Sequence, residues 1–289
     1  MYIRNYLAII ASLCVWSTWG LAVRWLGAPA LVLTFYNGLF SLCFQTALLI
    51  KAGRREDLHP GRDIGPLVFL GFCGLINVLS YFYALKATSI ATAVLTHYTA
   101  PIFVALFAPF MLKERMSRHT AVALAVSVGG LGMVVAGASS GDGLGIPGAA
   151  AGTLSGLAYG FLIILSRQLA GRHNPVKLPF VQSLVTVVCL APVVMVTDGL
   201  SLTLYQALGL IVVGVLHSTL AIVWYLYGVR VVTAQEAGVL GYLEPVFGIM
   251  LAYFFLSETP GVTAIGGGAL ILLSGAIVVY NGKRAEVKA

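Results

Sequence analysis

The chain has 289 residues, of which 59% are hydrophobic and only 9% are charged, and its mean hydropathy is +0.95. A soluble globular domain is about 25% charged, so a soluble fold of this size would lack the charges to cover its surface. These values exclude a soluble protein and indicate an all-α integral membrane protein whose apolar segments face the lipid bilayer. The net charge of +7 does not indicate nucleic-acid binding, because the basic residues lie in short runs between apolar segments.

Ten apolar stretches are long enough to cross a bilayer, for which a helix needs about 20 residues. They cover approximately residues 5–24, 31–50, 64–85, 91–112, 119–137, 147–166, 178–196, 206–227, 235–256 and 262–281. The first stretch continues without a small-residue cleavage site, so it is interpreted as a retained helix rather than a signal peptide. With the N-terminus in the cytoplasm, all of the 17 Lys and Arg residues except Arg24 and Lys86 fall in cytoplasmic segments. The positive-inside rule therefore predicts ten transmembrane helices with both termini cytoplasmic.

The chain contains an internal repeat, because residues 83–136 align without gaps to residues 227–280. The paired identities include Tyr98/Tyr242, Pro101/Pro245 and Glu114/Glu258. The predicted halves are residues 1–138 and 139–289, each with five spans, so the second half crosses the membrane in the opposite sense. Such inverted five-helix repeats are typical of secondary transporters, in which two exchanged conformations open one central site to opposite sides.

The Pro-centred helices that end in Leu112-Lys113-Glu114 and Leu256-Ser257-Glu258 resemble the drug/metabolite transporter superfamily, EamA-like family. The stretches Trp16 to Gly20 and Leu243 to Phe247 are similar to that family too. Among its subfamilies, the chain is most similar to bacterial amino-acid exporters of the YddG type. The resemblance implies a cell inner (plasma) membrane location and export of amino acids, including aromatic ones. Export of other metabolites or cationic drugs and channel-like passage remain alternatives.

Aromatic and polar residues at membrane depth predict a substrate-binding cavity between spans 1, 3, 4, 6, 8 and 9. Its expected lining is Trp19, Asn77, Tyr81, His97, Tyr98, Tyr159, His217, Trp224, Tyr225, Tyr242 and Glu244. Aromatic faces with a few polar groups suit an amphipathic small molecule and hold an ammonium group by cation–π contact. The other interpretation of the rings is an aromatic belt at the membrane interface.

Glu244 has two interpretations, one functional and one structural. An intramembrane carboxyl is a functional candidate, either for a substrate ammonium group or for a coupling proton. Alternatively, it caps the backbone that the neighbouring Pro245 opens. Pro101 and Pro245 remove backbone hydrogen bonds, so both are predicted to kink their helices around the cavity. His97 and His217 are titratable but have no second ligand at helical spacing, so no metal site is predicted.

Two further patterns concern the contacts between helices. Gly148, Gly152, Gly156 and Gly160 form three consecutive GxxxG steps that predict close helix packing. Glu114 and Glu258 end their helices, where the helix dipole disfavours an anion. Each therefore needs a cation, and the inverted symmetry predicts two gating ion pairs, Glu114–Arg230 and Glu258–Lys86.

The sequence does not predict an enzyme or a cofactor. It contains no HExxH, and its one G-x-S-x-G match, Gly137 to Gly141, lies in a loop without a strand–turn–helix setting. No GxxxxGK[ST] phosphate-binding loop occurs, so ATP is not the expected energy source. We therefore expect alternating access of a small organic solute, driven by the solute gradient or by protons.

Overall fold

The computed structural model describes residues 2–59, 61–88, 90–138, 146–197, 201–257 and 261–288. These residues form helices and connecting turns, without a strand among them. Nine helical stretches of the described part are long and apolar enough to cross a membrane, and a shorter apolar helix covers Ile3–Ser17. The predicted all-helical membrane architecture is confirmed.

The helices follow the predicted spans in chain order, with several spans divided into two pieces. They are α1 (Tyr2–Ser17), α2 (Trp19–Leu26), α3 (Ala30–Lys51), α4 (Ile64–Ala87), α5 (Ile90–His97), α6 (Ala100–Met111), α7 (Arg118–Ala138), α8 (Ile146–Ala170), α9 (Lys177–Val196), α10 (Leu204–Val215), α11 (Ile222–Gly228), α12 (Ala234–Gly241), α13 (Leu243–Leu256) and α14 (Val262–Lys288). Short 3₁₀ helices at Arg55–Leu58 and Gly61–Asp63 lie between α3 and α4, and a π-helical segment, Leu216–Ala221, joins α10 to α11.

The first predicted span, residues 5–24, is not one helix. It is interrupted at Thr18, between α1 and α2. The hydroxyl of Ser17 donates to the Cys14 carbonyl and that of Thr18 donates to the Val15 carbonyl, both at 2.7 Å. Such local side-chain bonds compete with the helical backbone ladder, and they end α1 where hydropathy alone predicts continuation.

The spans that contain Pro101 and Pro245 are interrupted at matching positions. Tyr98 and Thr99 separate α5 from α6, and Tyr242 separates α12 from α13. Pro101 lies in the first turn of α6, where its missing N–H costs little. The downstream pieces also end alike, because Lys113 and Ser257 both have a positive φ, 58° and 57°. The local structure thus repeats at an offset of 144 residues.

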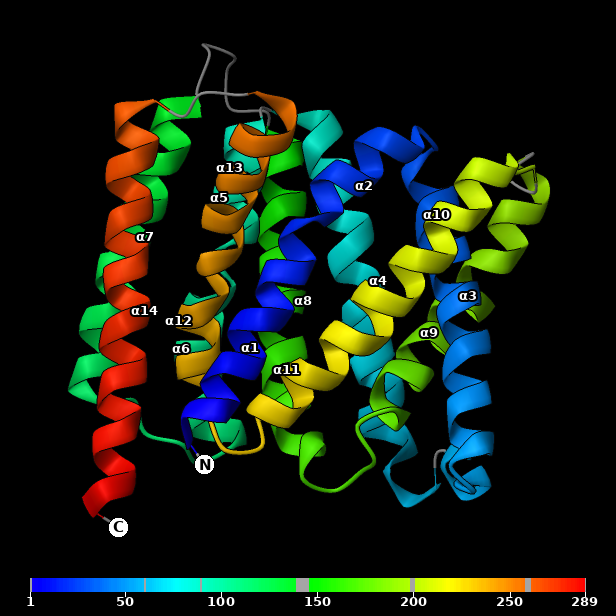
Figure 1. Cartoon of the computed structure of the whole chain (residues 1–289), viewed down its shortest axis with the longest axis horizontal. Helices are drawn as coiled ribbons and strands as arrows, with labels where there is room; N and C mark the ends of the chain where they lie inside the picture. Colours follow the sequence, from blue (N-terminus) through cyan, green and yellow to red (C-terminus); the bar gives the residue numbers. More distant parts are fainter. Residues whose placement is uncertain are drawn as a thin grey trace.

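Helices α7 and α14 pack together along one edge of the molecule (Figure 1). Their backbones nearly touch, because a Cβ atom added at Gly130 would lie 2.7 Å from the carbonyl oxygen of Gly267. The hydroxyls of Ser127 and Ser274 hydrogen-bond each other across the same interface. Residue numbers rise on one helix as they fall on the other, so the two helices run antiparallel.

Several other helix contacts occur in pairs. In each pair, corresponding helices of the first and second halves of the chain change places. Helix α4 of the first half packs on α8 of the second half, and correspondingly α11 of the second half packs on α1 of the first. In the same way, α4 packs on α9, and α10 packs on α3. The spans interrupted at Tyr98 and at Tyr242 contact each other through α6 and α12. Helix α1 begins and α14 ends at the same end of the bundle, where the α6–α7, α8–α9 and α11–α12 connections also lie (Figure 1).

Candidate functional site

The interrupted helices bring aromatic and polar side chains together beside the breaks. We call this group the central cluster, and its members come from α4, α8 and both interrupted spans. They are Asn77, Tyr81, His97, Tyr98, Ser155, Tyr159, Tyr242 and Glu244. Seven of these eight side chains were predicted to line the cavity, and Ser155 was not.

His97 lies among three tyrosine rings of the cluster. The ring centroid of Tyr81 is 4.3 Å away, and Tyr159 stacks at 5.3 Å with an interplanar angle of 7°. Tyr98 meets the imidazole edge-on at 4.9 Å. His97 is buried at 8% exposure.

A chain of hydrogen bonds fixes the orientation of the His97 ring. Nδ1 of His97 lies 2.8 Å from Oγ of Ser155, which is fully buried on α8. The Ser155 hydroxyl in turn lies 2.8 Å from both the backbone oxygen and the side-chain Oδ1 of Asn77 on α4. Three different helices therefore hold one imidazole.

Glu244 is the acidic member of the cluster and lies in the first turn of α13. Its carboxyl group lies near the side chains of Tyr98, Tyr81 and Tyr159. The Tyr242 hydroxyl is buried without a hydrogen-bond partner in the described part of the chain. An unpartnered buried hydroxyl costs about 1–3 kcal/mol, so this group favours a ligand or water beside it.

A second group lies where α1 meets the π-helical segment. We call it the Trp16 group, after Trp16 on α1, whose indole Nε1 donates to the His217 carbonyl at 3.0 Å. Thr18 Oγ1 lies 2.9 Å from His217 Nε2, and the Trp19 ring meets the His217 ring at 5.6 Å. Trp16 also packs on Tyr225 at 5.3 Å. Predicted residues Trp19, His217 and Tyr225 therefore lie together.

The π-helical segment depends on side chains from α3. A π turn leaves backbone groups without their usual α-helical partners. Gln45 Nε2 donates to the Ser218 carbonyl at 2.8 Å, and the Ser41 hydroxyl lies 3.2 Å from the Gly214 carbonyl. Gln45 is fully buried. These bonds satisfy the irregular backbone and so set the position of His217.

We expect Gln45→Leu to lower the thermal unfolding midpoint in detergent by several degrees, because it removes the hydrogen bonds that Gln45 donates to the Ser218 carbonyl and to Thr219 Oγ1, at about 1–3 kcal/mol. Phe44→Leu, on the exposed side of the same turn, is the matched control and should leave the midpoint unchanged. Equal midpoints for Gln45→Leu and the unmodified protein would contradict the role given to Gln45.

Trp224 and Lys86, which the sequence predicted as site residues, lie outside these groups. Trp224 on α11 is 37% exposed and makes none of the ring contacts that join the other aromatic residues in the described chain. Its neighbour Tyr225 points inward instead, so Trp224 faces the exterior. Lys86 is exposed at the end of α4, and its predicted partner Glu258 lies outside the described residues. No group of three or more metal-binding side chains occurs among the residues that were described.

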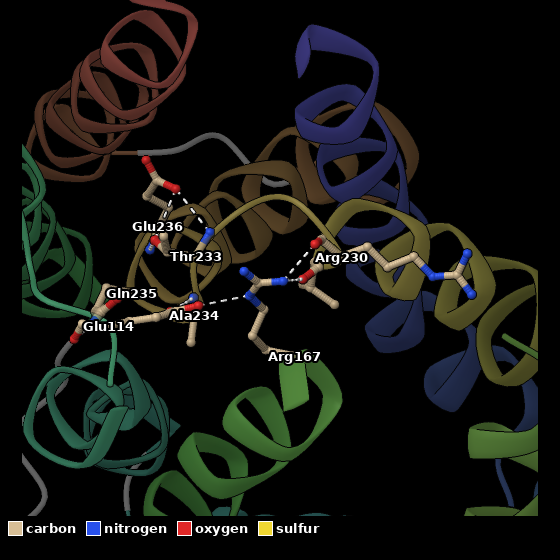
Figure 2. Close-up of polar contacts among 8 residues, drawn as sticks. Glu114, Arg167, Arg230, Thr233, Ala234, Gln235 and Glu236 are labelled. Atoms are coloured by element: carbon tan, nitrogen blue, oxygen red, sulfur yellow. Dashed lines mark hydrogen bonds and ion pairs between the residues drawn. The ribbon is translucent and has the colours of Figure 1, made fainter. Parts of the chain in front are cut away.

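The predicted ion pair Glu114–Arg230 is wrong, because Arg167 at the end of α8 pairs with Glu114 instead. Arg167 Nε donates to Glu114 Oε1 at 2.9 Å, and its Nη1 donates to the carbonyl of Arg230 at 2.6 Å (Figure 2). The guanidinium of Arg230 points away from Glu114 (Figure 2) and donates to the Ala170 carbonyl at 2.7 Å. Basic side chains commonly bind the last carbonyls of a helix in this way.

The second carboxylate oxygen of Glu114 accepts a hydrogen bond from the backbone N–H of Ala234 at 2.9 Å. Ala234 is the first residue of α12, where free N–H groups and the helix dipole favour an anion. Gln235 also donates to the Glu114 carbonyl at 3.2 Å. Glu114 and Arg167 thus join the ends of α6, α8 and α11 to the start of α12, and we call this set the end latch (Figure 2).

The predicted glycine contact joins α8 to the first interrupted span. A Cβ atom added at Gly156 would lie 2.5 Å from Thr99 Oγ1 and 2.7 Å from the His97 carbonyl oxygen. One added at Gly160 would lie 3.1 Å from the Ala100 carbonyl oxygen. The glycine ridge, Gly148, Gly152, Gly156 and Gly160, therefore lets α8 approach the backbone on both sides of the break.

A model of the EamA-like transporter family matches residues 3–136 and again residues 146–280. This chain belongs to the EamA-like transporter family. EamA-like proteins are membrane transporters rather than enzymes, which agrees with the absence of catalytic motifs noted in the sequence.

Relatives of this EamA-like protein are named as transporters too. An uncharacterized transporter of Archaeoglobus fulgidus is 28% identical over 95% of both chains. The pseudopaline exporter of Pseudomonas aeruginosa is 27% identical over 85% of this chain and 84% of its own. The S-adenosylmethionine uptake transporter of Rickettsia felis is 24% identical, with coverages of 87% and 85%. A solved crystal structure with 22% identity aligns at a TM-score of 0.84 over 98% of each chain, so it shares the fold.

Sequence reasoning missed three residues of this EamA-like protein, namely Ser155, Trp16 and Arg167. Ser155 is a hydroxyl beside the glycine ridge of an otherwise apolar helix, and that position was a usable signal. Trp16 was noted only as part of a family-like stretch. Arg167 was counted only as a topology-determining charge, and its partner Glu114 is 53 positions away, so no local pattern connects the two.

Proposed function

We propose that this EamA-like protein exports small organic solutes by alternating access, and that amino acids, including aromatic ones, are its substrates. The observation that carries the proposal is Glu244, a carboxyl group in the first turn after a helix break and close to tyrosine rings. A carboxylate with aromatic faces suits an ammonium group, and the rings suit an apolar or aromatic side chain. The proposed site is the central cluster.

The alternating mechanism is supported by the paired helix contacts. In the proposal, residues 1–138 and 139–289 are inverted repeats that exchange conformations around the central cluster. The matching breaks at Tyr98 and Tyr242 support the exchange, as do the two separate family matches. The end latch joins helices at one end of the bundle, which is the cytoplasmic end if both termini are cytoplasmic in the inner membrane, as the basic residues favour.

The proposal is tested by uptake of radiolabelled amino acids into proteoliposomes, with and without a pH gradient. Saturable uptake with trans-stimulation is expected, because an alternating-access transporter carries solute on one site that faces the two sides in turn. Trans-stimulation distinguishes this mechanism from a channel. Glu244→Gln should reduce uptake at least tenfold, since a hydrogen bond to a charged group contributes about 1.5–3 kcal/mol. Glu56→Gln, which changes an exposed carboxyl of a connecting segment, is the control. A dependence on the pH gradient that Glu244→Gln removes would support proton coupling.

Uptake no faster than in empty vesicles would overturn the amino-acid assignment. The alternative substrates are other metabolites and cationic drugs, for which the same carboxyl and rings are suited. One relative is named for the uptake of S-adenosylmethionine, so that compound belongs in the panel. Leakage that neither saturates nor responds to solute on the far side would indicate channel-like passage instead.

A further inference from the structure

The hydroxyl of Ser155 has three polar neighbours but only one proton to donate. They are His97 Nδ1, the Asn77 backbone oxygen and Asn77 Oδ1, each at 2.8 Å. A serine hydroxyl donates one hydrogen bond and accepts two. The backbone oxygen of Asn77 can only accept, so the Ser155 proton must point to Asn77, or two oxygen lone pairs would face each other at 2.8 Å.

This proton assignment decides the tautomer of His97. Because Ser155 donates to Asn77, its oxygen is an acceptor towards His97, and Nδ1 must carry the hydrogen. A neutral imidazole has one N–H and one acceptor nitrogen, so Nε2 carries a lone pair. The argument holds for either orientation of the Asn77 amide, since the backbone oxygen accepts in both.

The remaining nitrogen, Nε2, is available to a ligand. Within the described chain it makes no hydrogen bond, whereas Nδ1 is held by Ser155. Glu244 in the same cluster is likewise an acceptor when ionised. Two acceptors among electron-rich rings, with no Lys or Arg in the cluster, favour a group rich in N–H donors.

We propose that Ser155 is a positioning residue that holds His97 as its Nδ1–H tautomer, so that Nε2 accepts a hydrogen bond from the ammonium group of the substrate. This inference rests on the proposed function of the central cluster. The opposite tautomer would present an N–H at the same point and would suit a substrate carboxylate. Ser155 therefore selects which end of a zwitterionic solute meets His97.

The tautomer is measured directly by NMR of purified protein labelled with ¹⁵N-histidine. The His97 signals are assigned by their loss in His97→Gln. We expect a protonated Nδ1 and an unprotonated Nε2 in the unmodified protein, and a shift of the proton towards Nε2 in Ser155→Ala. Thr153→Ala, which removes an exposed hydroxyl on the same helix, should leave the spectrum unchanged. A protonated Nε2 in the unmodified protein, or an unchanged Ser155→Ala spectrum, would overturn the proposal.

Transport tests the second half of the proposal. We expect Ser155→Ala to lower the preference for phenylalanine over its deaminated analogue 3-phenylpropionate about tenfold, mainly through KM, which is the effect of one charge-assisted hydrogen bond. His97→Gln places an acceptor near the Nε2 position and should keep most of the preference, whereas His97→Asn is too short and should lose it. An unchanged preference in Ser155→Ala would contradict the substrate orientation. The NMR result needs no transport, so a failure of the proposed function is distinguishable from a failure of the tautomer assignment.

Discussion

Gly156→Val is expected to abolish transport and to destabilise the folded protein by about 3 kcal/mol or more. The new Cβ would lie 2.5 Å from Thr99 Oγ1 and within 2.8 Å of the carbonyl oxygens of Thr96 and His97. Overpacking of an interior typically costs about 1–3 kcal/mol, and backbone carbonyls yield less readily than the end of a side chain. Displacing α8 would also move Ser155 away from His97. Thermal unfolding in detergent and uptake by proteoliposomes measure the two effects.

The matched control for this substitution is Gly129→Val. Gly129 lies in α7, and a Cβ added there would have no heavy atom within 4 Å. The same change of residue therefore adds the same apolar volume to a transmembrane helix without a collision. Equal midpoints and uptake rates for Gly156→Val and Gly129→Val would show that the glycine ridge does not determine the approach of α8.

The second large effect is expected at the end latch. Glu114→Gln leaves the guanidinium of Arg167 without its counter-ion in a partly buried position, with side-chain exposures of 25% for Arg167 and 15% for Glu114. We expect a loss of about 2–3 kcal/mol of stability, because hydrogen bonds to charged groups are the stronger class. The latched end should also open more often, which faster hydrogen exchange at the Ala234 amide would detect.

A double-mutant cycle isolates the pair from other effects of each substitution. Glu114→Gln and Arg167→Gln, alone and together, should give a coupling free energy above about 1 kcal/mol. The same cycle on the pair Arg54 and Asp57 is the comparison, because Arg54 is 53% exposed. Exposed pairs contribute about 0–1 kcal/mol, so a smaller coupling free energy is expected there. A coupling energy near zero for Glu114 and Arg167 would remove the end latch as a stabilising contact.

Hydropathy and proline positions predicted most of the fold, because both act locally. The nine long spans match apolar stretches, and the breaks near Pro101 and Pro245 fall where a missing N–H disturbs the helix. The π-helical segment had no such signal. Its sequence, Leu216–Ala221, contains neither proline nor glycine, and the side chains that stabilise it lie on α1 and α3.

The candidate site was predicted by residue type but not by geometry. Titratable residues at membrane depth are few, so His97 and Glu244 stood out in the sequence, and Tyr81 was noted as part of an aromatic group. Which of them would meet depended on helix rotation. On α11, Tyr225 faces inward while its neighbour Trp224 faces outward. The partner of Glu114 depended on whether Arg167 or Arg230 reaches it across the bundle, and only the fold determines that distance.

The glycine ridge makes the two halves unequal in a way that affects transport kinetics. At the offset that aligns Trp19-Gly20 with Tyr159-Gly160, Trp16 on α1 occupies the place of Gly156 on α8. Helix α1 therefore cannot approach the second interrupted span as closely as α8 approaches the first. The two exchanged conformations would then differ in free energy, which shifts their populations. For a carrier without a coupling ion, half-saturating solute concentrations would differ between the two faces of the membrane, whereas Vmax/KM would stay equal in both directions.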